Sequence, residues 1–252
     1  MNKAAPVPPD SPAPAEPRDR PPERRLIAPL WHTAVLVAFL LALAGYGVYL
    51  QNAASSKTQL VEHRGSALPF YLSLIAAQWA MLRFVTAAGL KRTGTRLRDL
   101  LGERWASWRD VVRDAAIALA VWAAWTAATT AVERSMGSDS ARGIASLLPR
   151  DPVEVAVWIV LSLTAGFCEE AIFRGYLQKQ FEALTGSAAL AILGQALVFG
   201  IAHGYQGIRN VVAITVYGAL FGLVAWWRKS LKPGMILHAW TDIFGGIFAR
   251  AG

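Results

Sequence analysis

The sequence has few of the residues on which most enzyme and binding motifs depend. Its 252 residues include one cysteine, Cys168, and four histidines. A single cysteine excludes a disulfide framework and a cysteine-rich zinc site. The His-Glu-x-x-His signature of zinc proteases, a serine nucleophile elbow and a glycine-rich phosphate loop are all absent from the sequence. A basic, aromatic nucleic-acid platform is absent too, so no nucleic-acid partner is expected.

Charge is also scarce, and hydrophobic residues take its place. Charged residues make up 17% of the chain and hydrophobic residues 54%, whereas a soluble domain would carry more charge. The apolar residues come in blocks of about twenty, which is long enough to cross a hydrocarbon core. We predict an all-α, polytopic transmembrane helical bundle with a membrane-embedded polar active-site cavity. The seven predicted spans are 30–50, 67–88, 111–132, 153–173, 188–203, 210–227 and 233–249.

The chain divides into three predicted regions. Residues 1–26 are rich in proline and charge without apolar periodicity, which predicts a disordered cytoplasmic tail. Residues 27–150 should form the N-terminal transmembrane helices, with a basic amphipathic segment near 91–110 on the membrane surface. Residues 151–252 contain the motifs described below. We expect no cleavable signal peptide, because the first apolar run begins near Leu30 and is long enough to span.

Positive charge predicts the orientation of the chain. Lysine and arginine are concentrated in the N-terminal tail, in residues 91–109, at Lys179 and in residues 228–232. By the positive-inside rule these segments are cytoplasmic, so with seven spans the C-terminus is outside. The formal net charge of +8 fits loop cations that contact the anionic lipid of the bilayer.

Three ionisable residues follow one another in the fourth predicted span. An ionisable residue near the bilayer centre costs about 2.5–3.5 kcal/mol on insertion scales, so these residues need a partner or a function. Glu170 and Arg174 are four residues apart, share a helix face and can pair. Glu169 lies about 100° round the helix without a local cation. We therefore predict that Glu170 is the structural partner of Arg174 and that Glu169 is the free base. The helix is expected to continue to Gly186.

Two of the four histidines lie in the same part of the chain. His203 closes an apolar stretch, with Phe199 one turn before it on the same helix face. His238 lies near the start of the last span, and Asp242 follows it by one turn, so the two project together. The remaining histidines, His32 and His63, are interpreted as incidental.

This set of residues suits hydrolytic chemistry. One glutamate with two histidines is a familiar ligand set for a zinc site that keeps one position for water. Glu169, His203 and His238 are therefore candidate ligands for zinc or another divalent metal. A carboxylate beside a histidine-bound or metal-bound water can act as a general base. Cys168 could be a nucleophile, but a small, apolar-tolerant residue on a helix is the simpler interpretation.

The motifs together resemble those of the CAAX protease and bacteriocin-processing (CPBP) family, intramembrane proteases related to the CAAX prenyl endopeptidase. That pattern is Glu-Glu-x-x-x-Arg, Phe-x-x-x-His and His-x-x-x-Asn or Asp, and here it covers roughly residues 153–249. The resemblance implies peptide-bond hydrolysis at the membrane by a catalytic set that the motif positions supply. That set is Glu169, Glu170, His203, His238 and Asp242.

The resemblance also suggests individual roles. Glu169 and His203 would activate the water, whereas His238 and Asp242 would stabilise the oxyanion or complete a metal site. Many members have Asn at the last position, and an ionised Asp242 can only accept hydrogen bonds. This favours a metal ligand, a protonated Asp or an orienter of His238. The sequence does not decide between a metalloprotease and a glutamate-type protease.

The leading hypothesis is an intramembrane endopeptidase, in a bacterial inner membrane, that acts on membrane-associated or lipidated peptides. The first alternative is a non-catalytic membrane protein, such as a bacteriocin immunity or assembly factor, that keeps the same fold. A metal or proton transporter is a weaker alternative, because transporters usually show repeated halves or broken helices, and neither is found. The substrate and the oligomeric state are left open.

Overall fold

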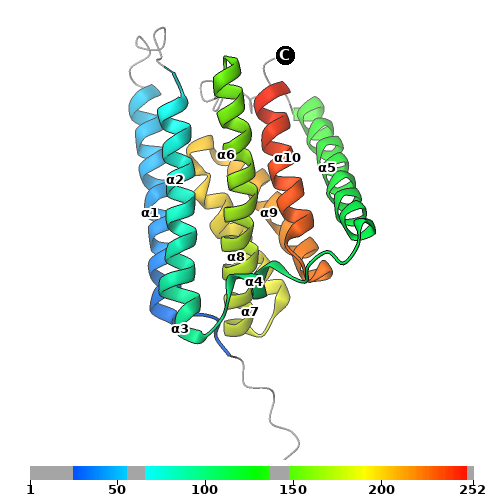
Figure 1. Ribbon diagram of the computed structural model, residues 1–252. Coiled ribbons are helices and arrows are strands. Elements are labelled where there is room, and N and C mark those ends of the chain that lie inside the picture. Colours follow the sequence, from blue (N-terminus) through cyan, green and yellow to red (C-terminus); the bar gives the residue numbers. More distant parts are fainter. Residues whose placement is uncertain (1–24, 56–65, 137–147, 249–252) are drawn as a thin grey trace, which may run out of the picture.

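We describe the protein from a computed structural model, which describes residues 25–55, 66–136 and 148–248 (Figure 1). Within these ranges every regular element is a helix. The proline-rich segment up to residue 24 and His63 lie outside the described residues. The longer helices are α1 (Leu30–Ser55), α2 (Leu68–Phe84), α5 (Trp108–Met136), α6 (Pro152–Glu170), α7 (Gln178–Thr185), α8 (Ala188–Ala202), α9 (Ile208–Arg228) and α10 (Lys232–Phe248). The shorter ones are η1 (Val85–Leu90), α3 (Lys91–Thr93), α4 (Leu97–Leu101), η4 (Ala171–Leu177) and η5 (Gly204–Gln206).

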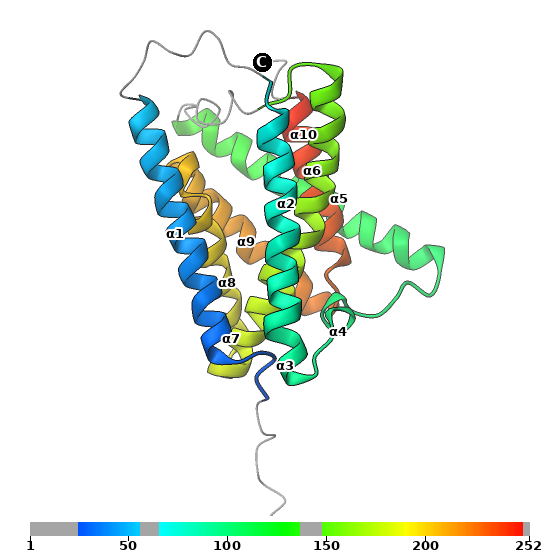
Figure 2. The same ribbon diagram turned by 60° about the vertical axis from the view of Figure 1, so that its left-hand side comes forward.

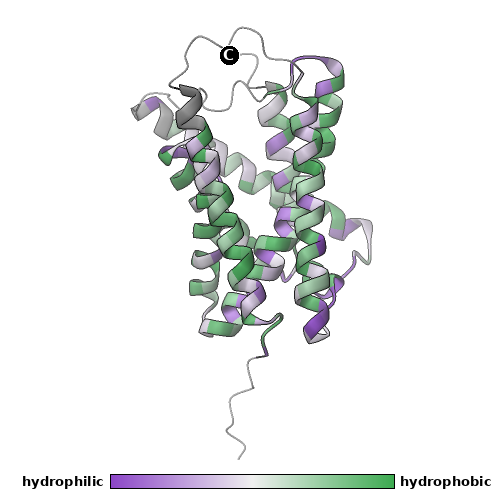
Figure 3. Ribbon diagram, turned by 90° about the vertical axis from the view of Figure 1, so that its left-hand side faces the viewer, coloured by the Kyte–Doolittle hydropathy of each residue, from purple (hydrophilic) through white to green (hydrophobic). Residues whose placement is uncertain are grey.

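The all-α, multi-pass prediction is confirmed. Five helical stretches are long and apolar enough to cross a membrane, and each coincides with a predicted span: Leu30–Leu50, Leu68–Thr93, Trp108–Ala131, Pro152–Thr185 and Ile208–Arg228. The other two predicted spans correspond to α8, a shorter apolar helix of 15 residues, and α10, a helix of 17 residues. At 1.5 Å per residue α8 is about 22 Å long, less than a bilayer core. Figure 3 shows helices that are mostly hydrophobic along their length.

The helix α6 lies at the centre of the bundle. It packs against α2 on one side and α10 on the other, and α10 packs in turn against α5 (Figure 1). The helices α8 and α9 pack against each other, and α8 also contacts α1 (Figure 2). The helix α8 also contacts η4 (Ala171–Leu177), which directly follows the glutamates, so both helices that carry the site histidines adjoin the glutamate helix.

The helix that carries the glutamates is continuous but changes its winding. Residues 152–170 form α6, residues 171–177 form the π-helix η4, and residues 178–185 form α7. Its start is fixed by the Asp151 side chain, which accepts hydrogen bonds from the backbone N–H groups of Val153 and Glu154. Its end is Gly186, with a left-handed φ of 70°. The predicted continuation past Arg174 to Gly186 is therefore confirmed. A π-helical turn often marks a functional site, and this one begins directly after Glu170.

Two glycines allow α10 to approach the glutamate helix closely. A Cβ atom on Gly166 of α6 would lie 2.8 Å from the backbone oxygen of Met235. A Cβ atom on Gly234 of α10 would lie 2.9 Å from Glu170 Oε2. Small residues at helix contacts are the usual means of close packing in membranes. Both positions bring the backbone of α10, and with it His238, against Glu170.

Basic residues gather at one end of the bundle. Arg25 donates to the backbone oxygen of Thr93, Lys179 to that of Asp99 and Lys232 to that of Glu103. We call this end, where α3, α4, the end of α7 and the start of α10 lie together, the basic end (Figure 1). The predicted amphipathic segment 91–110 is not one helix, because left-handed glycines at 94 and 102 interrupt it. Its position on the membrane surface stays a prediction.

Candidate active site

Glu170 and Arg174 form an ion pair inside the bundle. Arg174 Nη1 donates to Glu170 Oε1 over 2.9 Å, and the two side chains are 1% exposed or less. The spacing of one helical turn predicts this pairing, and the pairing is present. Removing one partner of a buried pair leaves an uncompensated charge, which costs about 3–5 kcal/mol. Each residue therefore makes the burial of the other tolerable.

The Arg174 guanidinium is enclosed by groups from two further helices. It lies 4.2 Å from the ring centroid of Phe199 on α8 and 4.8 Å from that of Phe221 on α9. Its Nη2 donates to the backbone oxygen of Gly218 over 3.3 Å, and Gln195 Nε2 donates to the same oxygen over 3.0 Å. Cation–π contacts of this kind strengthen when water is excluded. Arg174 consequently connects the glutamate helix to both α8 and α9.

Glu170 also fixes His238 of α10. The Nδ1 atom of His238 lies 3.0 Å from Glu170 Oε1. Because an ionised carboxylate only accepts, Nδ1 is the donor in this hydrogen bond. The other ring nitrogen, Nε2, lies 3.8 Å from Glu169 Oε2 and 3.7 Å from Asp242 Oδ2. One ring nitrogen of His238 is therefore fixed by a hydrogen bond, and the other lies near two carboxylates.

Glu169 differs from Glu170 in what its oxygens contact. Its Oε1 accepts a hydrogen bond from Gln78 Nε2 of α2 over 2.9 Å. Its Oε2 is buried and has no hydrogen-bond partner, although the side chain as a whole is 17% exposed. An acceptor of this kind is normally satisfied by protein or by water. Glu170 Oε2 is buried without a partner as well, but it is Glu169 Oε2 that lies near His238 Nε2.

His203 lies at the end of α8, beside Phe199. Its Nδ1 donates to the backbone oxygen of Phe199 over 2.8 Å, because a carbonyl can only accept. In the neutral imidazole Nε2 is then the acceptor. The Phe199 ring centroid lies 4.8 Å from that of His203 and 6.1 Å from that of His238. Phe199 thereby lies between the two histidines.

Asp242 is the most open member of the group. Its side chain is 37% exposed, compared with 10% for His238. Its backbone oxygen accepts a hydrogen bond from Trp158 Nε1 of α6 over 2.9 Å, and the neighbouring Thr241 is hydrogen-bonded to Tyr217 of α9. The backbone at Asp242 is therefore fixed, while its carboxylate faces the accessible side of the cluster.

The predicted site residues thus fall into two groups. Glu169, Glu170, Arg174, His238 and Asp242 form one network of charged side chains, and His203 adjoins it through Phe199. Within the described residues, no group of three or more His, Cys, Asp or Glu side chains is arranged to hold a metal ion. The Nδ1 atom of His203 is engaged by a backbone carbonyl, which leaves only Nε2 for any ligand. The role of Glu169, His203 and His238 as metal ligands stays a prediction.

Gln78 is the contact that sequence reasoning missed. It lies on α2, 91 positions before Glu169, in a helix for which no motif was found. Its Oε1 is also buried without a partner. The available signal was a glutamine in the middle of an apolar span, which is costly to bury unless it bonds to something.

His32, interpreted from the sequence as incidental, has a structural role. His32 is fully buried, and its Nδ1 lies 2.8 Å from the Tyr176 hydroxyl. Its ring stacks on Phe84 with centroids 4.4 Å apart. It joins α1 to the end of α2 and to η4, and it lies outside the network of catalytic candidates. Cys168 is also fully buried among apolar side chains, as expected for a packing residue.

Comparison with known proteins gives one match. Residues 151–244 match the family described as type II CAAX prenyl endopeptidase Rce1-like. This segment contains the three motifs and the whole charged network. Gln78, which contacts Glu169, lies outside it. The resemblance inferred from the motifs is thereby confirmed over this segment. No curated protein and no solved structure matches the chain.

The buried pair makes a stability prediction. Replacing Arg174 with Gln leaves the Glu170 carboxylate buried without its cation, so we expect a loss of about 3–5 kcal/mol in unfolding free energy. The measurement is denaturant unfolding of the purified protein in detergent micelles. Arg83→Gln, which removes an exposed arginine on α2, serves as the control and should change stability by under about 0.5 kcal/mol. Equal stability of the two variants would contradict the buried pair.

Proposed function

We propose that this multi-pass membrane protein is an intramembrane endopeptidase, because residues 151–244 match the type II CAAX prenyl endopeptidase Rce1-like family. The observation that carries the proposal is the free, buried Oε2 of Glu169, 3.8 Å from His238 Nε2. A carboxylate oxygen with no donor of its own, beside a fixed imidazole, is suited to bind and activate water.

Glu169 is the general base of the proposed reaction. Its Oε2 accepts one proton of the bound water, and the water oxygen attacks the carbonyl carbon of the scissile peptide. The tetrahedral intermediate then collapses with cleavage of the C–N bond. The proton passes from Glu169 to the departing amine nitrogen, so the carboxylate is regenerated. Positioned proton transfer of this kind contributes about 10²–10⁴-fold to the rate.

The histidines divide the remaining work. With Nδ1 donating to Phe199, His203 offers Nε2 as the acceptor that orients the water toward the carbonyl carbon. His238, with Nδ1 fixed by Glu170, donates from Nε2 to the oxyanion when it is protonated. Asp242, 3.7 Å from that nitrogen, orients and stabilises the imidazolium. Of the roles that the sequence left open for Asp242, the orienter of His238 agrees best with these distances.

The proposed substrates are membrane-associated or lipidated peptides. The active side chains lie within apolar helices, so a substrate must reach them from the bilayer or from its surface. We also propose that the basic end is cytoplasmic, which follows from the positive-inside rule, and that the protein resides in a bacterial inner membrane. Reporter fusions at residue 1 and at residue 252 test the orientation.

The main test is cleavage of a fluorogenic lipidated or transmembrane peptide by purified protein. We expect Glu169→Gln, which keeps the shape but removes the base, to lower kcat by about 10²–10⁴-fold. His203→Ala should lower it in the same way through loss of water orientation. The matched control is Glu103→Gln, the same change at an exposed glutamate outside the network, and it should retain the activity of the wild type.

The outcome also separates the proposal from a non-catalytic role. Equal cleavage by wild type, Glu169→Gln and His203→Ala would contradict the assignment of the base. Absence of cleavage by the wild type on every lipidated and transmembrane peptide, with altered stability in the variants alone, would instead favour an immunity or assembly factor. Size-exclusion profiles and thermal midpoints of all variants confirm that each is folded before rates are compared.

The metal question has its own test. Because the described side chains do not gather three ligands, we expect activity to survive exhaustive chelation and dialysis. Metal content is measured by plasma mass spectrometry on the same sample in which cleavage is assayed. About one equivalent of zinc together with loss of activity on chelation, restored by added zinc, would support the metal-assisted mechanism that the motifs also allow.

Gln78 should act as a positioning residue for Glu169. Replacing it with Met keeps the length of the side chain but removes the donor to Oε1, so the carboxylate can rotate and Oε2 is no longer fixed. Loss of a hydrogen bond to a charged group is worth about 1.5–3 kcal/mol, so we expect kcat to fall at least about tenfold with KM nearly unchanged. Steady-state kinetics measures both constants.

The control for Gln78 lies on the same helix. Ser73→Ala removes an exposed hydroxyl that donates to the backbone oxygen of Phe70, and it should leave kcat and KM as in the wild type. A purely structural role for Gln78 would lower the thermal midpoint without a selective loss of kcat. That result would remove Gln78 from the active site.

A further inference from the structure

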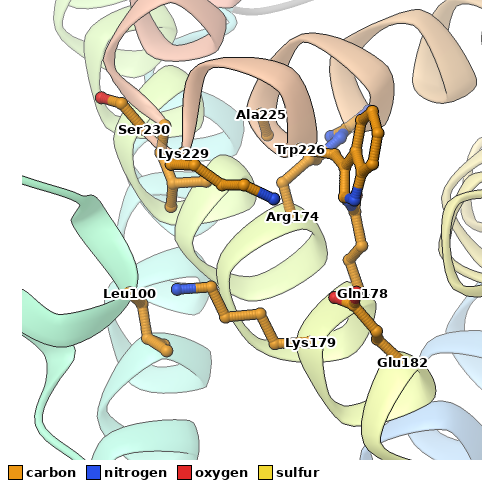
Figure 4. A pocket seen from close by; sticks show the side chains of 10 residues that line it. Leu100, Arg174, Gln178, Lys179, Glu182, Ala225, Trp226, Lys229 and Ser230 are labelled. Atoms are coloured by element: carbon orange, nitrogen blue, oxygen red, sulfur yellow. The ribbon is translucent and has the colours of Figure 1, made fainter. Parts of the chain in front are cut away.

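A small cavity lies at the basic end, apart from the network of catalytic candidates but bounded by one of its members. Its volume is about 110 Å³, roughly that of three to four water molecules, which suits a small polar group rather than a chain segment. It lies between α7, the end of α9, the start of α10 and α4 (Figure 4). The lining residues used below are Arg174, Gln178, Lys179, Glu182, Trp226 and Lys229.

Two lysines give the cavity its charge. Lys179 of α7 and Lys229, which directly follows α9, both line the cavity (Figure 4). Lys179 Nζ donates to the backbone oxygen of Asp99 over 3.1 Å, and an ammonium has two further donors. Lys229 adopts a left-handed φ of 52°, and its Nζ lies 4.8 Å from the ring centroid of Trp226. Glu182 is the one carboxylate that lines the cavity, so positive charge exceeds negative charge.

Two polar atoms of deeply buried residues have no partner on the cavity wall. Arg174 is 1% exposed and Gln178 4%, and neither Arg174 Nε nor Gln178 Oε1 has a hydrogen-bond partner. Buried polar atoms are normally satisfied, so each unsatisfied one requires an explanation. The first is a donor and the second an acceptor. Both atoms are closed to water, so a ligand in the cavity is held by the lysines and interacts with the Arg174 charge through space.

The surroundings indicate the source of such a ligand. Indole rings are enriched at the level of lipid headgroups, and Trp226 lines the cavity next to the two lysines. Basic pockets between transmembrane helices bind anionic lipid headgroups. We propose that this cavity binds the phosphate diester of an anionic glycerophospholipid, with the phosphate on Lys179 and Lys229, beside the buried charge of Arg174. This proposal is independent of the proteolytic function.

The test measures lipid binding to the full-length protein in a zwitterionic detergent. Native mass spectrometry gives dissociation constants for phosphatidylglycerol and for phosphatidylcholine, and a thermal-shift titration gives that for inorganic phosphate. We expect phosphatidylglycerol to bind at least tenfold more tightly than phosphatidylcholine. Lys179→Gln combined with Lys229→Asn should weaken it about 25-fold, which is about fivefold for each cation near a membrane surface. Asn is chosen at 229 because it tolerates a positive φ.

The control removes two cations from the same end outside the cavity. Lys91→Gln combined with Arg104→Gln changes two exposed residues and should alter the dissociation constant by less than twofold. Inorganic phosphate that binds the wild type, and loses affinity only in the cavity variant, would support phosphate recognition with the free anion as its source. Equal phosphatidylglycerol affinity in the wild type and the cavity variant, or no preference over phosphatidylcholine, would overturn the proposal.

Discussion

The buried ion pair between Glu170 and Arg174 is the interaction on which the arrangement of the site depends. A single charge in an apolar helix bundle is costly to bury, whereas a pair with further hydrogen bonds is tolerated. Here the pair has such support, because Arg174 also contacts Phe199, Phe221 and the backbone oxygen of Gly218. These groups come from α8 and α9. One cation thus joins three helices at the point where the chemistry is proposed.

The same pair separates the roles of the two adjacent glutamates. Glu170 Oε1 is shared between Arg174 and His238, so its position is determined by two cation-capable groups. Glu169, one residue earlier, points elsewhere, and its Oε1 accepts a hydrogen bond from Gln78. A general base needs an oxygen that is both positioned and free. In the proposed reaction the two adjacent glutamates meet this need together. Glu170 holds Arg174 and His238 in place, and Oε2 of Glu169 binds the water.

What could be predicted from the sequence follows from how local each contact is. The pairing of Glu170 with Arg174 and the helix end at Gly186 depend on spacing within a single helix, and both are present. The adjacency of His238 and Asp242 was expected for the same reason, and their nearest charged atoms lie 3.7 Å apart. The stronger contact of His238 is with Glu170, 68 positions away, and no local pattern contains it.

The partners of Gln78 and His32 could not be predicted from the sequence either. Each is a polar residue in an apolar helix, and its partner lies on another helix 91 or 144 positions away. Burial predicts that such residues have partners, but the identity of the partner depends on how the helices pack. The π-helical winding of residues 171–177 is likewise not visible in the apolar periodicity of the sequence, although it follows immediately after the glutamates.

Arg174 also connects the proposed lipid cavity to the proposed active site. Its Nη1 bonds Glu170, its Nη2 bonds Gly218, and its Nε has no partner. The residue lines the cavity, so an anion bound there would lie beside the guanidinium that pairs with Glu170, the carboxylate that positions His238. Because the interior of the bundle screens charge poorly, a phosphate beside Arg174 would weaken the electrostatic attraction between Arg174 and Glu170. Occupancy of the cavity would therefore strengthen the hydrogen bond that Glu170 accepts from Nδ1 of His238. Arg174, the cation that compensates the buried charge of Glu170, would then also be the group through which a bound lipid affects His238.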